Sequence, residues 1–223
     1  MVNPKKVNCT GFPANLLPAG VTDPTAQLEK IARRAVEMLT NTIDELTRVR
    51  VSVLAGKPIG WPLLSDVVGM SLAQRMNINV EDRAAWRGDG PGKVGLVIRW
   101  LTRVRDLLAS GDLRYTCLAK DCNPGDWAWT FPPTPGNLAW KPKLDFFHIR
   151  LCKRFWTPTV KPEIHFEFQA QTLIHETTHI YYASLDDKGV SPWIAECVSQ
   201  FVTECNGGPL DPDFSDRCVK KAH

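Results

Sequence analysis

The segment that most constrains this chain is the run His175-Glu176-Thr177-Thr178-His179. Residues four apart on an α-helix lie on the same face, so the two imidazoles can reach one cation. Zinc binds histidine nitrogens at about 2.0–2.1 Å. Glu176 stands one position round the helix, where its carboxylate can act on a water at the metal without being a ligand. The run therefore predicts a helix with a zinc site, in which His175 and His179 are ligands and Glu176 is the general base.

The residues around this run support a buried helix. Apolar side chains flank it at Leu173, Ile174, Ile180 and Tyr181, and no Pro or Gly interrupts residues 163–188. The competing interpretation is a core helix whose two histidines fall in register by chance. Glu176 directly after the first histidine argues against a chance register, because H-E-x-x-H is the order found in zinc peptidases. We therefore expect a zinc-dependent metalloendopeptidase that hydrolyses polypeptide substrates.

Composition excludes several other classes. The chain has 223 residues, enough for one domain with a full core, and it is 43% hydrophobic and 23% charged, as globular proteins are. A formal charge of +3 without a long Lys/Arg run gives no reason to expect nucleic-acid binding. No apolar stretch reaches the ~20 residues of a membrane helix. We expect a single domain over residues 1–223 and a monomer, with no membrane span and no visible signal peptide.

The cysteines predict disulfide bonds. No pair has the C-x₂-C spacing of a structural zinc site, and seven cysteines are many for a cytosolic enzyme of this length. Free buried cysteines are the alternative. Disulfides imply an oxidising compartment, so the protein is expected to be secreted or otherwise extracytoplasmic, with one thiol left over. The seven are Cys9, Cys117, Cys122, Cys152, Cys197, Cys205 and Cys218.

Helices are expected in the first half of the chain. Asp23-Pro24 can begin a helix, with a capping carboxylate followed by proline at the first helical position. Apolar residues then recur three and four apart from Leu28 to Leu46, which predicts an amphipathic helix of more than twenty residues. A second such helix is expected from Val94 to Leu108, and a shorter one near residues 64–72.

Short strands are expected in the second half. Residues 115–117, 127–131 and 147–152 have the alternating or apolar texture of strands, and a last helix is expected near residues 192–204. The predicted fold class is therefore α+β. Residues 1–112 should be mainly helical, and residues 113–223 should supply a small twisted sheet, the metal-binding helix and a C-terminal helix.

The order of these features resembles the deuterolysin and peptidyl-lysine metalloendopeptidase family, the aspzincins, over roughly four-fifths of the chain. The features that carry the resemblance are Cys9, the Leu28–Leu46 helix, Cys117 and Cys122, Trp127–Phe131, Ile149–Cys152 with Phe155-Trp156, and Leu173–Glu176. The segment around residues 52–92 departs from the shorter members. The resemblance implies a single zincin-like metalloprotease domain.

The resemblance also implies two disulfide pairs, Cys9–Cys117 and Cys122–Cys152. For the last pair we expect Cys205–Cys218, which leaves Cys197 free. Preference for lysine or basic segments in the substrate is a further implication, for which Asp186, Asp187 and Glu204 could supply a pocket.

Two candidates compete for the third zinc ligand. In aspzincins this ligand is an Asp shortly after the second His, and Asp187 falls at that place, although the surrounding family pattern is incomplete. In gluzincins it is a Glu on the next helix, and the run from Pro192 to Phe201 places Glu196 there. A buried carboxylate at 196 would need a partner, which a metal can supply. Glu196 is favoured over Asp187. The alternative is that Glu196 faces solvent.

Other hypotheses remain open. The chain could be a toxin-like effector protease delivered into another cell, where it would cut a few selected targets. It could also be a non-catalytic binding module with a degenerate site, although the intact Glu176 argues against that. His148 and His165 are candidates for minor roles near the substrate or the metal. The strand Phe146–Cys152 could hold an extended substrate by main-chain pairing.

Overall fold

The computed structural model describes residues 6–17, 21–59, 63–130, 147–182, 194–210 and 218. Contacts divide the chain into two compact units. The first unit comprises residues 1–36 and 106–185, and the second comprises residues 37–105 and 186–223. Both units are therefore discontinuous in sequence.

The first unit contains a four-stranded sheet with the order β1-β2-β4-β3. The strands are β1 (Lys6–Asn8), β2 (Arg114–Thr116), β3 (Ala128–Trp129) and β4 (His148–Leu151). β1 pairs with β2 and β2 with β4 in parallel, whereas β3 runs antiparallel to β4. The fold is thus mixed α+β, with six α-helices and this open sheet in the described part of the chain.

The position of β4 corrects one expectation. Tyr115 of β2 pairs with Ile149, and Trp129 of β3 pairs with Arg150. Because both sides of β4 are occupied, it is an inner strand and cannot pair with a substrate along its backbone. Strands β1 and β3 are the outer strands of the described sheet.

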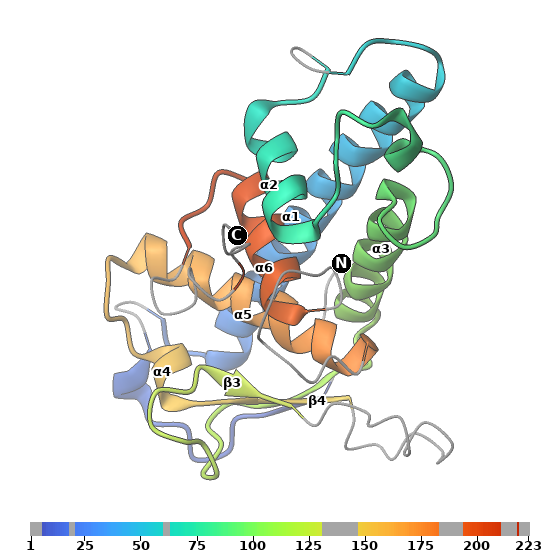
Figure 1. The fold of residues 1–223 in the computed structure, drawn as a ribbon. Coiled ribbons are helices and arrows are strands. Elements are labelled where there is room, and N and C mark those ends of the chain that lie inside the picture. The colour runs from blue at the N-terminus through green and yellow to red at the C-terminus, as the bar shows by residue number, and fades with distance from the viewer. Residues whose placement is uncertain are drawn as a thin grey trace. The chain divides into compact units, whose positions relative to one another are not determined.

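Helix α5 (Pro162–Tyr182) lies over one face of this sheet and contacts β3 (Figure 1). The short helix α4 (Lys153–Trp156) holds the first half of α5 through one carbonyl. The Phe155 carbonyl accepts from Nε2 of His165 at 2.9 Å and from Nε2 of Gln169 at 2.6 Å. An ion pair of 3.0 Å joins Glu167 of α5 to Arg34. These contacts fix the helix that carries the two candidate zinc ligands.

Helix α1 (Pro24–Leu54) begins where the sequence predicts and contributes its first residues to this unit. The Asp23 carboxylate accepts from the Thr25 backbone N–H at 2.8 Å, as an N-cap does. A 3₁₀ helix, η1 (Ala14–Leu16), precedes it. The buried core of this unit includes Leu28, Ile31, Ala35, Leu113, Tyr115, Ile149, Leu151, Phe155, Trp156, Phe168, Leu173 and Ile174.

Two disulfides close the first unit, and both pairings are those implied by the family resemblance. Cys9 is joined to Cys117, which connects the residue after β1 to the residue after β2. Cys122 is joined to Cys152 at the end of β4, with a Cα–Cα distance of 5.8 Å. The sheet is therefore crosslinked at the ends of three of its strands.

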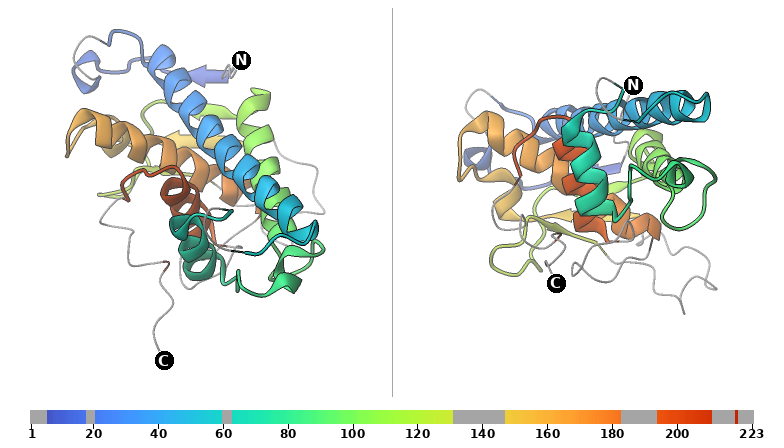
Figure 2. Two further views of the ribbon diagram at one scale, coloured as in Figure 1. Left: turned by 90° about the horizontal axis from the view of Figure 1, so that it is seen from above. Right: turned by 45° about the horizontal axis from the view of Figure 1, so that its top comes forward.

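The second unit is helical in its described residues. It contains the rest of α1, then α2 (Asp66–Met76), the 3₁₀ helix η2 (Arg83–Trp86), most of α3 (Val94–Ser110) and α6 (Ala195–Cys205). Helices α2 and α6 lie side by side (Figure 2). Ser65 caps α2 by accepting from the Val68 N–H. Buried residues here include Met38, Leu39, Leu46, Leu72, Met76, Ile78, Trp86, Val97, Leu101, Val198, Phe201 and Val202.

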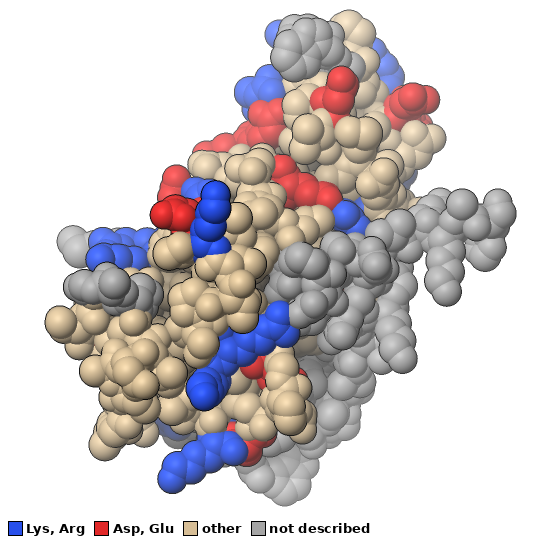
Figure 3. All heavy atoms as spheres, turned by 90° about the vertical axis from the view of Figure 1, so that its left-hand side faces the viewer, with Lys and Arg blue, Asp and Glu red and all other residues tan. Residues whose placement is uncertain are grey.

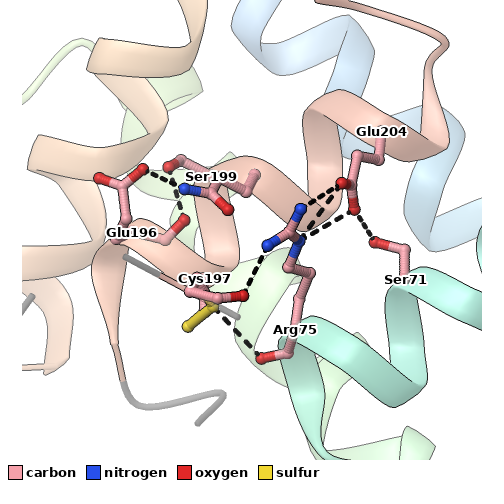
Figure 4. Close-up of a disulfide and its surroundings, with 8 residues drawn as sticks. Ser71, Arg75, Glu196, Cys197, Ser199 and Glu204 are labelled. Carbon is pink, nitrogen blue, oxygen red and sulfur yellow. Dashed lines mark hydrogen bonds and ion pairs between the residues drawn. A yellow bond between two sulfur atoms is a disulfide. The ribbon is translucent and has the colours of Figure 1, made fainter. Parts of the chain in front are cut away.

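The disulfide of the second unit corrects the expected pairing. Cys197 is joined to Cys218 with a Cα–Cα distance of 5.2 Å, and Cys205 is the free cysteine. Cys197 is in the first turn of α6 and is fully buried together with Cys218, whereas Cys205 ends the helix and is half-buried. The pair forms between the two fully buried sulfurs (Figure 4).

No helix in the described ranges is long and apolar enough to cross a membrane. The three disulfides fit an oxidising compartment outside the cytoplasm.

Candidate metal centre

The two histidines of H-E-x-x-H converge on one face of α5. Their Nε2 atoms are 2.9 Å apart, and their rings meet edge-on with centroids separated by 4.5 Å. Both side chains are half-buried. In this hydrogen bond the Nε2–H of one ring donates to the Nε2 of the other, so the two nitrogens face each other.

The residues between the two histidines are buried. Thr177 and Thr178 have no exposed surface, and their hydroxyls donate to the Leu173 and Ile174 carbonyls at 2.6 and 2.8 Å. Because these threonines satisfy their own polar groups within the helix, they can face the core. Their burial fixes the rotation of α5 and turns His175 and His179 outward.

A zinc ion fits this pair of nitrogens. Bonds of about 2.0–2.1 Å at a tetrahedral angle separate two ligand nitrogens by about 3.3 Å. The observed 2.9 Å is close enough that small ring rotations would admit the ion. Glu176 lies next to His175 in sequence and is 5% exposed, so its carboxylate sits in a partly desolvated environment.

Of the two candidates for the third zinc ligand, only Glu196 lies among the residues that the structure describes. Asp187 lies outside the described residues, as do Asp186 and Trp193. Glu196 is in the first turn of α6 and only 2% exposed. The solvent-facing alternative for Glu196 is therefore wrong. Across the described ranges, no group of three or more His, Cys, Asp or Glu side chains forms a metal cluster.

The buried Glu196 carboxylate has a hydrogen-bond donor one turn further along α6. Gln200 donates from Nε2 to Glu196 Oε1 at 2.6 Å. In Figure 4, Glu196 and the Arg75–Glu204 ion pair lie on different sides of α6. A carboxylate has about four lone-pair sites, so one that accepts from an amide can also bind a cation. Sequence reasoning missed Gln200, although its spacing of four from Glu196 is the signal that could have found it.

Glu204 does not form a pocket for a basic substrate side chain. Its carboxylate is bound by Arg75, with a shortest distance of 2.6 Å, and it also accepts from the Ser71 hydroxyl. Arg75 donates in addition to the Cys218 carbonyl at 2.6 Å (Figure 4). The charge of Glu204 is thus neutralised within its own unit, and its role is to join α2 to α6.

Two other histidines and two tryptophans among the described residues of the first unit have structural roles. His165 is 2% exposed, and burial lowers the pKa of its imidazole, which donates to the Phe155 carbonyl. His148 is hydrogen-bonded through Nε2 to the Thr116 hydroxyl at 2.8 Å. Trp127 and Trp156 are core residues with 4% and 0% exposure.

The described charged side chains are mixed in sign on one face of the molecule. On the face drawn in Figure 3, Lys and Arg side chains are interspersed with Asp and Glu, and uncharged surface separates them. This face therefore has no large field of one sign that would attract a strongly charged partner.

Comparison of the chain with protein-family models, with curated proteins and with solved structures found no match.

Proposed function

We propose that this protein is a zinc-dependent metallopeptidase that hydrolyses peptide bonds in extended polypeptides. The observation that carries the proposal is the 2.9 Å approach of the His175 and His179 Nε2 atoms beside the buried Glu176. The three disulfides support action in an oxidising, extracytoplasmic compartment.

His175 and His179 would hold the metal, and the sequence pattern predicts a carboxylate as the third ligand, Glu196 or alternatively Asp187. Two imidazoles and one carboxylate are a ligand set that catalytic zinc uses. When bound, zinc makes water acidic enough to give up a proton near neutral pH and polarises the scissile carbonyl.

Glu176 moves the proton in this mechanism. Its carboxylate takes a proton from the attacking water, whose oxygen bonds to the carbonyl carbon of the substrate. Glu176 then gives that proton to the amine as the carbon–nitrogen bond breaks.

Exchange of Glu176 for Gln tests the proposal directly. The Gln side chain has the same shape but cannot take the proton, so we expect peptide hydrolysis to fall by about 10²–10⁴-fold while bound zinc stays at one equivalent. Glu163→Gln is the matched control, because Glu163 is an exposed carboxylate on the same helix. Retention of wild-type activity in Glu176→Gln would refute the mechanism.

The third ligand is tested by zinc content. Glu196→Gln and Asp187→Asn each remove one carboxylate without changing shape, and we expect only Glu196→Gln to lose zinc. The reverse result would assign the ligand to Asp187. Casein serves as the activity substrate: broad digestion indicates a general protease, and cleavage of a few proteins alone indicates a selective effector.

A further inference from the structure

Gln171 stands one helical turn before His175 on α5. The spacing of four places Gln171, His175 and His179 along the same face of the helix. Gln171 is 5% exposed. Its Oε1 atom is shielded from solvent and has no hydrogen-bond partner among the residues that the structure describes.

An unpartnered amide oxygen in a buried position is unusual. Most buried polar atoms in folded proteins have a hydrogen-bond partner. A buried donor or acceptor without a partner costs the folded state the full free energy of desolvating that group. On the same helix, Gln169 illustrates the ordinary case, with its amide bonded to the Phe155 carbonyl. Trp127 Nε1 and His165 Nδ1 are in the same state among the described residues, but of these three atoms the Gln171 oxygen is the one on the helix face of His175 and His179, where a ligand can bring a donor.

Metal binding at the two histidines creates such a donor. In the pair as it stands, one ring carries its proton on Nε2 and donates it to the Nε2 of the other. A metal held by both Nε2 atoms requires both lone pairs, so in both neutral rings the proton resides on Nδ1. Each Nδ1–H then needs an acceptor, which in metal sites orients the ring and raises its basicity.

We infer that Gln171 is the positioning residue for His175, its Oε1 accepting the Nδ1–H of that ring when the metal is bound. Gln171 is suited to this because a side chain in a helix leans toward the preceding turn, which brings the His175 ring toward position 171. The inference rests on the zinc site of the proposed function. It adds a residue that touches neither the metal nor the substrate.

Zinc affinity of the whole chain tests the inference without reference to activity. Gln171→Met keeps the length of the side chain and removes the acceptor. We expect it to weaken zinc binding about 10–100-fold, measured by competition with a chelator, and to leave the melting temperature of the zinc-free protein unchanged or higher. Gln169→Met is the matched control. It breaks an existing bond, so it should lower that melting temperature by about 2–4 °C and leave zinc affinity unchanged.

A carboxylate at position 171 should restore the zinc affinity that Gln171→Met loses. Gln171→Glu restores an acceptor of the same shape, and we expect its zinc affinity to equal or exceed that of the wild type. Nitrogen NMR of the zinc-loaded rings should show the His175 Nδ1–H shifted when Gln171 is replaced by Met. Wild-type zinc affinity in Gln171→Met, or no rescue by Gln171→Glu, overturns the inference and leaves the zinc site intact. A wild-type protein that binds no zinc, or that binds it equally after His175→Ala, overturns the proposed function as well.

Discussion

At the scale of single residues, His165 couples stability to pH. Burial lowers the pKa of its imidazole, and the Arg154 charge acts in the same direction, while the bond to the Phe155 carbonyl partly opposes them. Below about pH 6.5 the unfolded chain takes up a proton at His165 that the folded chain does not. The free energy of unfolding should therefore fall with decreasing pH, by up to about 1.4 kcal/mol per pH unit, until the folded pKa is reached.

His165→Gln tests this coupling, because Gln can still donate to the Phe155 carbonyl but does not titrate. Urea unfolding of both proteins between about pH 5 and pH 8 should give a shallower acid loss in the variant. Contributions from the other histidines cancel in the difference. Equal pH slopes in the two proteins would contradict the prediction.

The free thiol of Cys205 should be unreactive in the folded protein. Burial raises the pKa of this thiol, and the carboxylates of Glu204 and Glu45 raise it further. Because the thiolate is the nucleophile, alkylation near about pH 8 should be slow in the native state and fast in denaturant. Mass spectrometry of the unreduced protein should find the label on Cys205. A label on Cys197 would contradict the observed pairing.

The local sequence pattern predicts some contacts of single residues and leaves others undecided. The i, i+4 spacing of His175 and His179 was sufficient to predict that their nitrogens converge. No local pattern distinguished Cys197 from Cys205 as the partner of Cys218, because both are on α6 and only burial separates them. Glu196 is a similar case, since its burial depends on neighbours in three dimensions.

At the scale of elements, the Arg75–Glu204 ion pair should be the strongest polar link between α2 and α6. The side chains are 8% and 21% exposed, so Arg75 is left charged and poorly solvated when its partner is removed. Glu204→Gln should lower the free energy of unfolding by about 3 kcal/mol. Urea unfolding measures the loss.

The double variant Arg75→Met with Glu204→Gln is the control for that link. When both charges are removed, no unpaired charge remains buried. The double variant should therefore lose less free energy of unfolding than the two single variants lose together. Additive losses would show that the two side chains do not interact.

Elements with strong periodicity were predictable, and short ones were not. Helices α1 and α3 follow their apolar spacing, and Gly111 ends α3 in the left-handed conformation at φ 74°. Strand β1 has three residues and α4 has four, too few for a period to show. Such elements exist because a partner supplies their hydrogen bonds, as β2 does for β1.

At the scale of the whole molecule, the three disulfides should contribute unequally to stability. A crosslink restricts the unfolded chain more when it closes a longer loop. The separations are 108 residues for Cys9–Cys117, 30 for Cys122–Cys152 and 21 for Cys197–Cys218. Replacing each pair by serines should therefore cost about 5 kcal/mol for the first pair and about 3 kcal/mol for the last.

Denaturant unfolding of the three double-serine variants gives the ranking. The variant lacking Cys9–Cys117 should be the least stable. A variant lacking Cys197–Cys218 that unfolds more readily than the others would show that native contacts around α6, rather than loop length, dominate.

By itself the sequence determined the α+β class, the long helices and the H-E-x-x-H face of α5, because each is encoded by spacing within one element. Tertiary structure alone decided the strand order with β4 inside the sheet, the Cys197–Cys218 pair, the burial of Glu196 and the solvent-shielded oxygen of Gln171. These depend on side chains that are distant along the chain and become neighbours only on folding. A helical period specifies which face of a helix is apolar, but it does not specify what that face will meet.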